Sequence, residues 1–462
     1  MKLSAMFAPR DMTEGTPWKR IIEFALPMLV GNIAQQLYNT VDSIVVGKYV
    51  GDNALAAVGS AAPIFSLLMV LFVGISTGAG IMVSQYFGAK DRDKLSHTIG
   101  TCITLTAISS LIIMVLGVII SRPMLELLNT PEAIIDWCHQ YLNIIFLGIA
   151  GSFYYNIFSG LLRGMGDSFS ALVYLLIATV LNIVLDLWFV AGLKMGVAGV
   201  ALATILAQFV SAALCMIQVL RMKESFDVTR ATLRPRSLYV KQVMRLGLPS
   251  GLTQAIFSLS MIVVQSLTNS FGEAVIAANV IIMRVDGFAM MPVFSFGMAL
   301  TTFTGQNIGA QKPERVVKGA RDCMLMTLGV SVVMVSLILI FGKYLMGLFT
   351  DTASLVELSN HMMRILALGY IAMGVSQCLS GVMRGAGDTM TPMWISIITT
   401  IVIRIPIAYL LAYLTRSDEY PVGRPESLFI SLLISWLLGM VINWIAYRRG
   451  KWKTKGLTTG QA

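Results

Sequence analysis

The chain has 462 residues, of which 56% are hydrophobic and only 13% are charged, and its mean hydropathy is +0.76. Soluble domains carry about a quarter of charged residues, so this composition excludes a soluble globular protein and favours an all-α integral membrane protein. The formal net charge of +10 would suit nucleic-acid binding only if the basic residues formed one surface.

Apolar segments follow one another along the whole chain. About twelve of them approach or exceed the roughly 20 residues that a helix needs to cross a bilayer, and we expect about twelve transmembrane helices. Residues 1–17 are polar and the run after them is too long for a signal peptide, so no cleaved leader is expected. The segments cover approximately residues 18–46, 54–86, 96–120, 132–158, 168–191, 196–221, 238–270, 274–304, 314–341, 354–382, 390–414 and 427–447.

The basic residues are distributed unevenly between alternate loops. If the N-terminus is cytoplasmic, the outer loops hold only Lys48, Arg122, Lys194, Lys343, Arg416 and Arg424, and most of the other Lys and Arg residues lie on the inner side. This positive-inside pattern predicts a multi-pass protein of the plasma (cytoplasmic) membrane with both termini in the cytoplasm. The basic surplus then contacts anionic lipid, and no nucleic-acid partner is expected.

The sequence contains two copies of one unit. Residues 159–168 (SGLLRGMGDS) recur 221 positions later, 380 minus 159, as residues 380–389 (SGVMRGAGDT). Each copy holds about six helices, and an even number requires the same orientation for both, with a pseudo-twofold axis along the membrane normal. The predicted organisation is a cytoplasmic arm 1–17, a first lobe 18–221, a linker 222–237, a second lobe 238–448 and a basic cytoplasmic tail 449–462.

The repeated stretch predicts a tight cytoplasmic turn in each lobe. Its acids suit capping of the next helix, its arginines suit the carbonyls of the preceding one, and its glycines permit the reversal. A structural turn is the favoured interpretation, and a hinge is the alternative. The residues are Arg163, Gly164, Gly166 and Asp167 in the first copy and Arg384, Gly385, Gly387 and Asp388 in the second.

Segment 18–46 is unusually polar for a membrane span. Gln35, Tyr38 and Asp42 share one helical face, and Asn39 is a neighbouring amide. Such a face should meet a hydrated cavity or the bundle interior, since a polar stripe is costly against lipid.

Two later segments supply polar partners for this face. Asn182 and Asp186 lie four residues apart in segment 168–191, and Thr204 lies in segment 196–221. Counting helical rise from each segment end, we expect Asp42, Asp186 and Thr204 to meet in the outer half of the first lobe.

The second lobe does not repeat these acids, because Val264 and Ile407 occupy the equivalent positions. It has Asp286 and Arg404 at similar depth instead. A structural ion pair between them is expected, with a role in substrate binding or gating as the alternative.

Amide and sulfur side chains suggest a substrate cavity. The 29 methionines most often fill cores or face lipid, although a soft, adaptable wall for apolar ligands is the alternative. The candidate cavity residues are Gln35, Asn39, Gln254, Gln265, Met290 and Gln377.

The twofold six-helix plan, Tyr38-x-x-x-Asp42, Asn182-x-x-x-Asp186 and the two Gly-rich turns resemble the multidrug and toxic compound extrusion (MATE) family. The resemblance covers nearly the whole chain and looks closest to the DinF-like branch, which includes MepA-like bacterial pumps. It implies export of organic cations or lipophilic drugs, coupled to proton or sodium entry through Tyr38, Asp42, Asn182, Asp186 and Thr204. Another branch places acids on its seventh and tenth helices, where this chain has none and shows Gln377.

These residues favour a secondary antiporter that works by alternating access over any enzyme. Two carboxylates in one poorly solvated site resist double ionisation, so the proton is the preferred coupling ion. Sodium is the alternative, because the same residues offer hard oxygen ligands. A lipid-linked saccharide flippase of the same superfamily is the second hypothesis, although the acidic, amide-rich first lobe suits a cation better. We expect no cofactor, no bound metal, no ATP-binding loop and a monomer in contact with membrane lipid.

Overall fold

The computed structural model describes residues 9–128 and 130–458, without the side chains of Asn39, Asp52, Pro63, Leu67 and Leu71. Parts of the predicted arm 1–17 and tail 449–462 therefore lie outside the described residues. The described chain consists of helices joined by turns and contains no strand. This agrees with the predicted all-α class.

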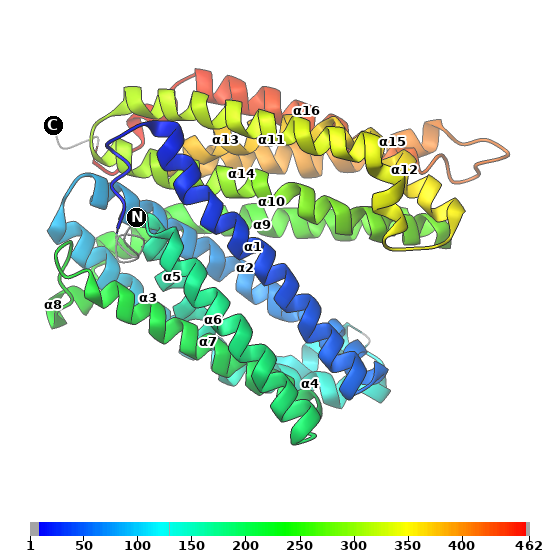
Figure 1. Ribbon diagram of the computed structural model, residues 1–462, viewed down its shortest axis with the longest axis horizontal. Helices are drawn as coiled ribbons and strands as arrows, with labels where there is room; N and C mark the ends of the chain where they lie inside the picture. The colour runs from blue at the N-terminus through cyan, green and yellow to red at the C-terminus, as the bar shows by residue number, and fades with distance from the viewer. Residues whose placement is uncertain (1–8, 129, 459–462) are drawn as a thin grey trace. The chain divides into compact units, whose positions relative to one another are not determined.

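The same series of helices occurs twice, in the order that the duplication predicts (Figure 1). The first series is α1 (Pro17–Tyr49), α2 (Asp52–Gly88), α3 (Arg92–Leu127), α4 (Glu132–Leu147), α5 (Ile149–Gly164), α6 (Ser168–Asp186) with the π-helical η2 (Leu187–Gly192), and α7 (Gly196–Arg221). The second is α9 (Ser237–Ser270), α10 (Glu273–Gly309), α11 (Pro313–Gly347), α12 (Ala353–Ala367), α13 (Gly369–Gly385), α14 (Met390–Ile397) with the π-helical η3 (Ile398–Ile403) and α15 (Arg404–Leu414), and α16 (Glu426–Arg448). The short α8 (Arg230–Leu233) lies between them, and the 3-10 helix η4 (Lys451–Thr454) follows them.

The number of spans agrees with the predicted twelve. Within residues 9–128 and 130–458, nine helical segments are long and apolar enough to cross a membrane, and two bent helix pairs pass the same test as single spans. Helix α1 has 33 residues, also long enough, but its polar face lowers its hydropathy. Large apolar side chains such as Ile119 (67% exposed) and Ile262 (69% exposed) are exposed on these helices, as expected of helices in a lipid bilayer.

Two segments predicted as continuous helices are broken. Helices α4 and α5 meet at a bend of 51°, and α12 and α13 meet at a bend of 44°. The equivalent residues Gly148 and Gly369 lie at these bends, and a Cβ atom on either would collide with a bulky side chain, Ile205 on α7 or Trp436 on α16. The bends therefore bring backbone close to a neighbouring helix, which helical periodicity alone does not predict.

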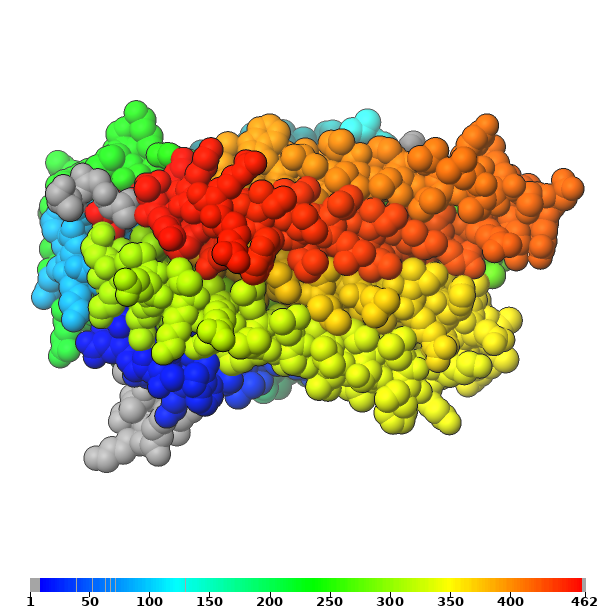
Figure 2. Space-filling model, turned by 90° about the horizontal axis from the view of Figure 1, so that it is seen from above, coloured from blue at the N-terminus to red at the C-terminus, as the bar shows by residue number. Residues whose placement is uncertain are grey.

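The chain forms two compact units, which we describe separately. Unit 1 contains Met1–Met12 and Leu26–Gly251, and unit 2 contains Thr13–Ala25 and Leu252–Ala462, so the division falls inside α1 and α9. In unit 1, stacked rings of Phe72 and Phe153 with centroids 3.8 Å apart sit in an apolar core formed mainly by α2, α4 and α5. In unit 2, α16 packs beside α12 and α13 (Figure 2).

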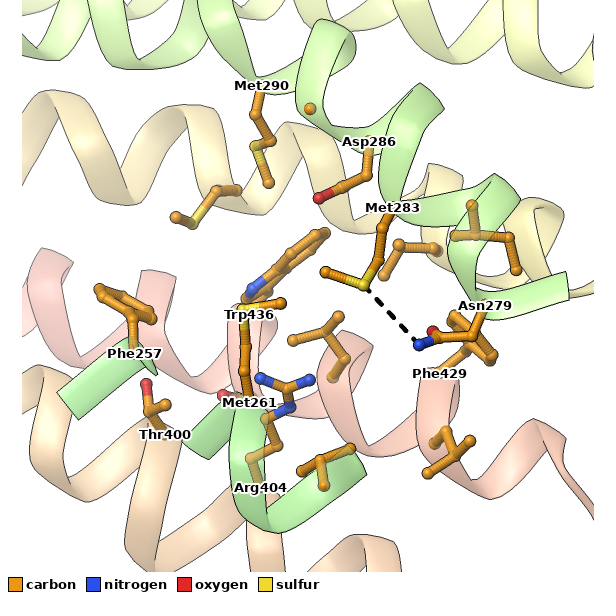
Figure 3. Close-up of a pocket in the computed structure, with 18 of the residues that line it drawn as sticks. Phe257, Met261, Asn279, Met283, Asp286, Met290, Thr400, Arg404, Phe429 and Trp436 are labelled. Atoms are coloured by element: carbon orange, nitrogen blue, oxygen red, sulfur yellow. Dashed lines mark hydrogen bonds between the residues drawn. The ribbon is translucent and has the colours of Figure 1, made fainter. Parts of the chain in front are cut away.

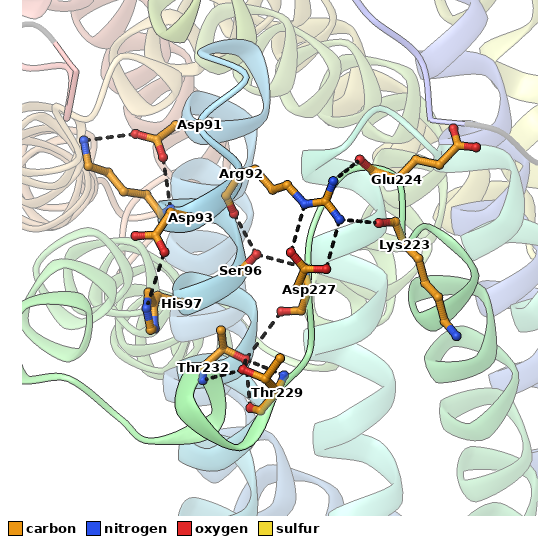
Figure 4. Close-up of polar contacts among 11 residues, drawn as sticks. Asp91, Arg92, Asp93, Ser96, His97, Lys223, Glu224, Asp227, Thr229 and Thr232 are labelled. Carbon is orange, nitrogen blue, oxygen red and sulfur yellow. Dashed lines mark hydrogen bonds and ion pairs between the residues drawn. The ribbon is translucent and has the colours of Figure 1, made fainter.

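The predicted linker 222–237 is fixed to α3 within unit 1 (Figure 4). Arg92 donates from two nitrogens to the carboxylate of Asp227, each at 2.9 Å, and the backbone N–H of Asp227 donates to Ser96 Oγ at 2.9 Å. Thr104 Oγ1 donates to the carbonyl of Leu233 at 2.6 Å. The Arg92 guanidinium lowers the pKa of the Asp227 carboxyl, so this contact is fully charged at neutral pH.

Candidate ion and substrate sites

All five residues predicted for ion coupling lie together in unit 1. Tyr38 and Asp42 come from α1, Asn182 and Asp186 from α6, and Thr204 from α7. The hydroxyls of Tyr38 and Thr204 are 3.4 Å apart. With its amide oriented to satisfy both ends, Asn182 donates to Asp186 Oδ2 at 2.9 Å and accepts from the Thr204 N–H at 3.2 Å.

The carboxyl groups of Asp42 and Asp186 lie close enough to interact with each other. Asp186 is only 1% exposed, and Oδ1 of each residue is buried without a hydrogen-bond partner in the described part of the chain. Two carboxylates this close in a dry site repel strongly when both are charged. The arrangement therefore favours one shared proton, or one cation in its place.

The helix type changes directly after Asp186, and an apolar cluster follows both acids in sequence. Asp186 is the last residue of α6, and the wider π-helical turns of η2 begin directly after it, a departure from α-helix that is frequent at functional sites. A cluster of small apolar side chains includes residues one helical turn beyond each acid in sequence. The cluster consists of Val45, Val46, Ala54, Val190, Val197 and Val200.

Two further polar residues of unit 1, on α4 and α7, were not predicted as site residues. Tyr141 on α4 lies near Asp42, Tyr38 and Asp186 and packs against the valine cluster. Gln208 on α7 has a buried Oε1 without a partner among the described residues. The spacing of four between Thr204 and Gln208 was a usable signal for Gln208, whereas Tyr141 has no polar neighbour in its segment that marks it.

Unit 2 contains a cavity of about 350 Å³ (Figure 3). Three of the predicted substrate residues, Gln254, Gln265 and Met290, line it. Gln377 instead lines an adjoining cavity of about 50 Å³, where it accepts a hydrogen bond from Arg384 at 3.4 Å.

The two remaining predicted substrate residues belong to unit 1. Gln35 is exposed on α1. The side chain of Asn39 lies outside the described residues.

The predicted ion pair between Asp286 and Arg404 is not formed directly. Both line the large cavity, but Asp286 Oδ1 accepts a hydrogen bond from the Tyr370 hydroxyl at 2.7 Å. Arg404 Nε is buried and has no hydrogen-bond partner among the described residues. The reason is that Tyr370 on α13 reaches the carboxylate, while the start of α15 holds Arg404 on another wall.

The two Gly-rich turns have the expected helix caps. Asp167 Oδ1 accepts from the backbone N–H of Ser170 at 2.9 Å, and Asp388 Oδ1 accepts from that of Thr391 at 3.3 Å. Gly166 and Gly387 have φ of 86° and 94°, a region that L-residues with a Cβ rarely adopt. Arg384, however, donates to Gln377 and so differs from the expected contact with terminal carbonyls.

One family model matches both halves of the chain. The MatE model matches residues 27–188 and again residues 249–410. The two matches are offset by 222 residues (249 minus 27), which agrees with the duplication found in the sequence.

Similar proteins include several multidrug resistance proteins. The probable multidrug resistance protein YoeA of Bacillus subtilis (strain 168) is 29% identical over 450 residues, covering 96% of this chain and 95% of YoeA. The probable multidrug resistance protein NorM of Thermotoga maritima is 25% identical, covering 96% and 94%. The multidrug export protein MepA of Staphylococcus aureus (strain NCTC 8325) is 22% identical, covering 85% and 87%.

Solved structures share the fold. A crystal structure of MATE in the bent conformation superposes with a TM-score of 0.89 at 23% identity, covering 95% of this chain and 96% of that one. An outward-facing multidrug resistance MATE family transporter of the MOP superfamily gives a TM-score of 0.87 at 23% identity, covering 95% and 97%.

Proposed function

The chain belongs to the MatE family, and from that premise we propose that it is a secondary antiporter that exports lipophilic organic cations in exchange for protons. Members of this family are multidrug transporters of the cell membrane and not enzymes. We further propose that it acts as a monomer in the plasma membrane, surrounded by lipid, with both termini cytoplasmic.

The Asp42–Asp186 pair is the observation that supports this proposal. Two neighbouring buried carboxyl groups resist double ionisation, so one of them keeps a proton unless a cation neutralises the pair. Proton entry from outside would thus displace a cationic cargo, and proton release inside would restore the negative charge. The same oxygen-rich site makes sodium the alternative coupling ion.

A lipid-linked saccharide flippase is the less favoured function. Its cargo carries a pyrophosphate, which needs cationic partners at the binding site. The unit 1 cluster offers two acids instead, and the similar proteins are multidrug proteins.

The test is transport by purified protein in proteoliposomes under separately imposed gradients. A pH gradient directed for antiport should drive uphill movement of ethidium without ATP, and an equal sodium gradient at uniform pH should not. Ethidium movement driven by the sodium gradient alone would show that sodium, and not the proton, is the coupling ion. An ethidium flux that is the same with and without either gradient would contradict the proposed antiport.

A further inference from the structure

The large cavity of unit 2 has one charge of each sign on its wall. Asp286 of α10 and Arg404 of α15 border a common space in Figure 3, and Met261, Met283 and Trp436 line the same space. We propose that this cavity is a second ligand site that binds an amphipathic zwitterion. The ligand's amine contacts Asp286, its acid contacts Arg404, and its apolar body lies on the sulfur and aromatic side chains.

Both charged residues retain unused hydrogen-bonding capacity. Among the described residues, Asp286 accepts one hydrogen bond, from the Tyr370 hydroxyl at 2.7 Å. A carboxylate has about four acceptor positions. Arg404 Nε is a buried donor without a partner among the described residues, and such a group is expensive to leave unsatisfied. A ligand with an ammonium and a carboxylate would satisfy both groups at once.

Charge balance favours a zwitterion over a singly charged ligand. The cavity wall carries one negative and one positive group, so a ligand with one of each adds no net charge to the buried site. A monocation would leave Arg404 buried and unpaired, which is the costly outcome for an ion in a dry environment. Guanidinium also binds carboxylate through two parallel hydrogen bonds, which selects a planar acid.

The rest of the cavity suits a small organic body of variable shape. Its volume of about 350 Å³ is at the small end of ligand pockets, which span roughly 300–1,000 Å³. Methionine side chains adapt to irregular apolar surfaces, and Trp436 offers a flat face. The π-helical η3 ends directly before Arg404, and such segments are frequent at functional sites.

The experiment uses one fluorescent scaffold in three charge states. Nε-dansyl-lysine is a zwitterion, its methyl ester is a cation, and its Nα-acetyl derivative is an anion. Each is titrated against the full-length protein in lipid nanodiscs, without any ion gradient. We expect the zwitterion to bind the unaltered protein at least tenfold more tightly than either derivative. Equal affinity of the zwitterion and its ester would overturn the proposal without any mutation.

Substitutions of Arg404 and Asp286 test the two proposed contacts with the ligand. Arg404→Gln should abolish the preference for the zwitterion over the ester, because the carboxylate loses its cationic partner and the ester no longer meets a second positive charge. Asp286→Asn should weaken the zwitterion and the ester alike. Arg364→Gln is the matched control, because Arg364 is an exposed arginine of unit 2 that does not line the cavity. If Arg404→Gln and Arg364→Gln bind the zwitterion equally, the assignment of Arg404 is wrong.

This site belongs to unit 2 and the Asp42–Asp186 pair to unit 1, and the titrations measure binding without coupling. Failure of antiport in proteoliposomes would therefore leave the zwitterion site intact, and failure of zwitterion binding would leave antiport intact.

Discussion

At the scale of single residues, the two units differ in the charges that they bury. Tyr38 and Thr204 are 166 residues apart in sequence and touch in unit 1, which places Asp42 beside Asp186. The repeat positions in unit 2 hold Val264 and Ile407, and Val264 is part of the apolar core. Duplication thus preserved the helices, while the coupling chemistry that we propose is confined to unit 1.

Asp42→Asn tests this assignment. The amide keeps the shape of the carboxyl and can donate to Asp186, so the variant should insert and fold, but it no longer exchanges a proton. We expect gradient-driven ethidium export to fall to the rate measured without a gradient. Glu357→Gln, which removes an acid whose side chain is 77% exposed, is the control and should transport normally. Near-normal export by Asp42→Asn would refute the coupling role.

At the scale of elements, one close helix crossing occurs in both units. A Cβ atom on Gly164 of α5 would lie 2.7 Å from the carbonyl oxygen of Gly80 on α2. The equivalent Gly385 of α13 faces the carbonyl oxygen of Thr301 on α10 in the same way. These crossings are the small-residue contacts that membrane helices use for close packing, and they explain why the Gly-rich stretch appears twice.

Gly385→Ala should separate α13 from α10. Overpacking of this kind costs about 1–3 kcal/mol, so the melting temperature in detergent should fall by several degrees. Gly329→Ala on α11 is the matched control, since a Cβ atom there meets no atom within 4 Å, and its melting temperature should not fall. Equal melting of the two variants would show that the crossing tolerates a methyl group.

At the scale of the whole molecule, orientation in the membrane follows from loop charge and span number. The Arg163 turn is largely buried and suits labelling poorly, but Lys90 and Gln311 are exposed in the equivalent α2–α3 and α10–α11 turns. Lys48 and Lys343 are exposed near the C-terminal ends of α1 and α11, which are predicted to face outside. The five native cysteines are all buried, so introduced ones can be read against a low background.

Single cysteines at these four positions test the topology. Lys90→Cys and Gln311→Cys should react with an impermeant maleimide only when the cytoplasmic side is open. Lys48→Cys and Lys343→Cys should react in intact cells. Opposite sidedness of Lys90→Cys and Gln311→Cys would contradict the parallel orientation of the two repeats.

The sequence by itself determined the spans, the duplication and the composition of the carboxylate site. Apolar length and loop charge are local properties, and bilayer thickness converts them directly into spans. Asp42, Asn182, Asp186 and Thr204 were predictable as one group, because each is too polar for lipid and helical rise sets its depth.

Only the tertiary structure decided the contacts that cross between helices. It bent two predicted segments, at Gly148 and at Leu368 directly before Gly369. It also packed Tyr141 against the valine cluster and formed a hydrogen bond from Tyr370 to Asp286 in place of the predicted Asp286–Arg404 ion pair. The physical reason is that helix rotation and close packing depend on side chains of several neighbouring helices at once, and no periodicity within one segment contains that information.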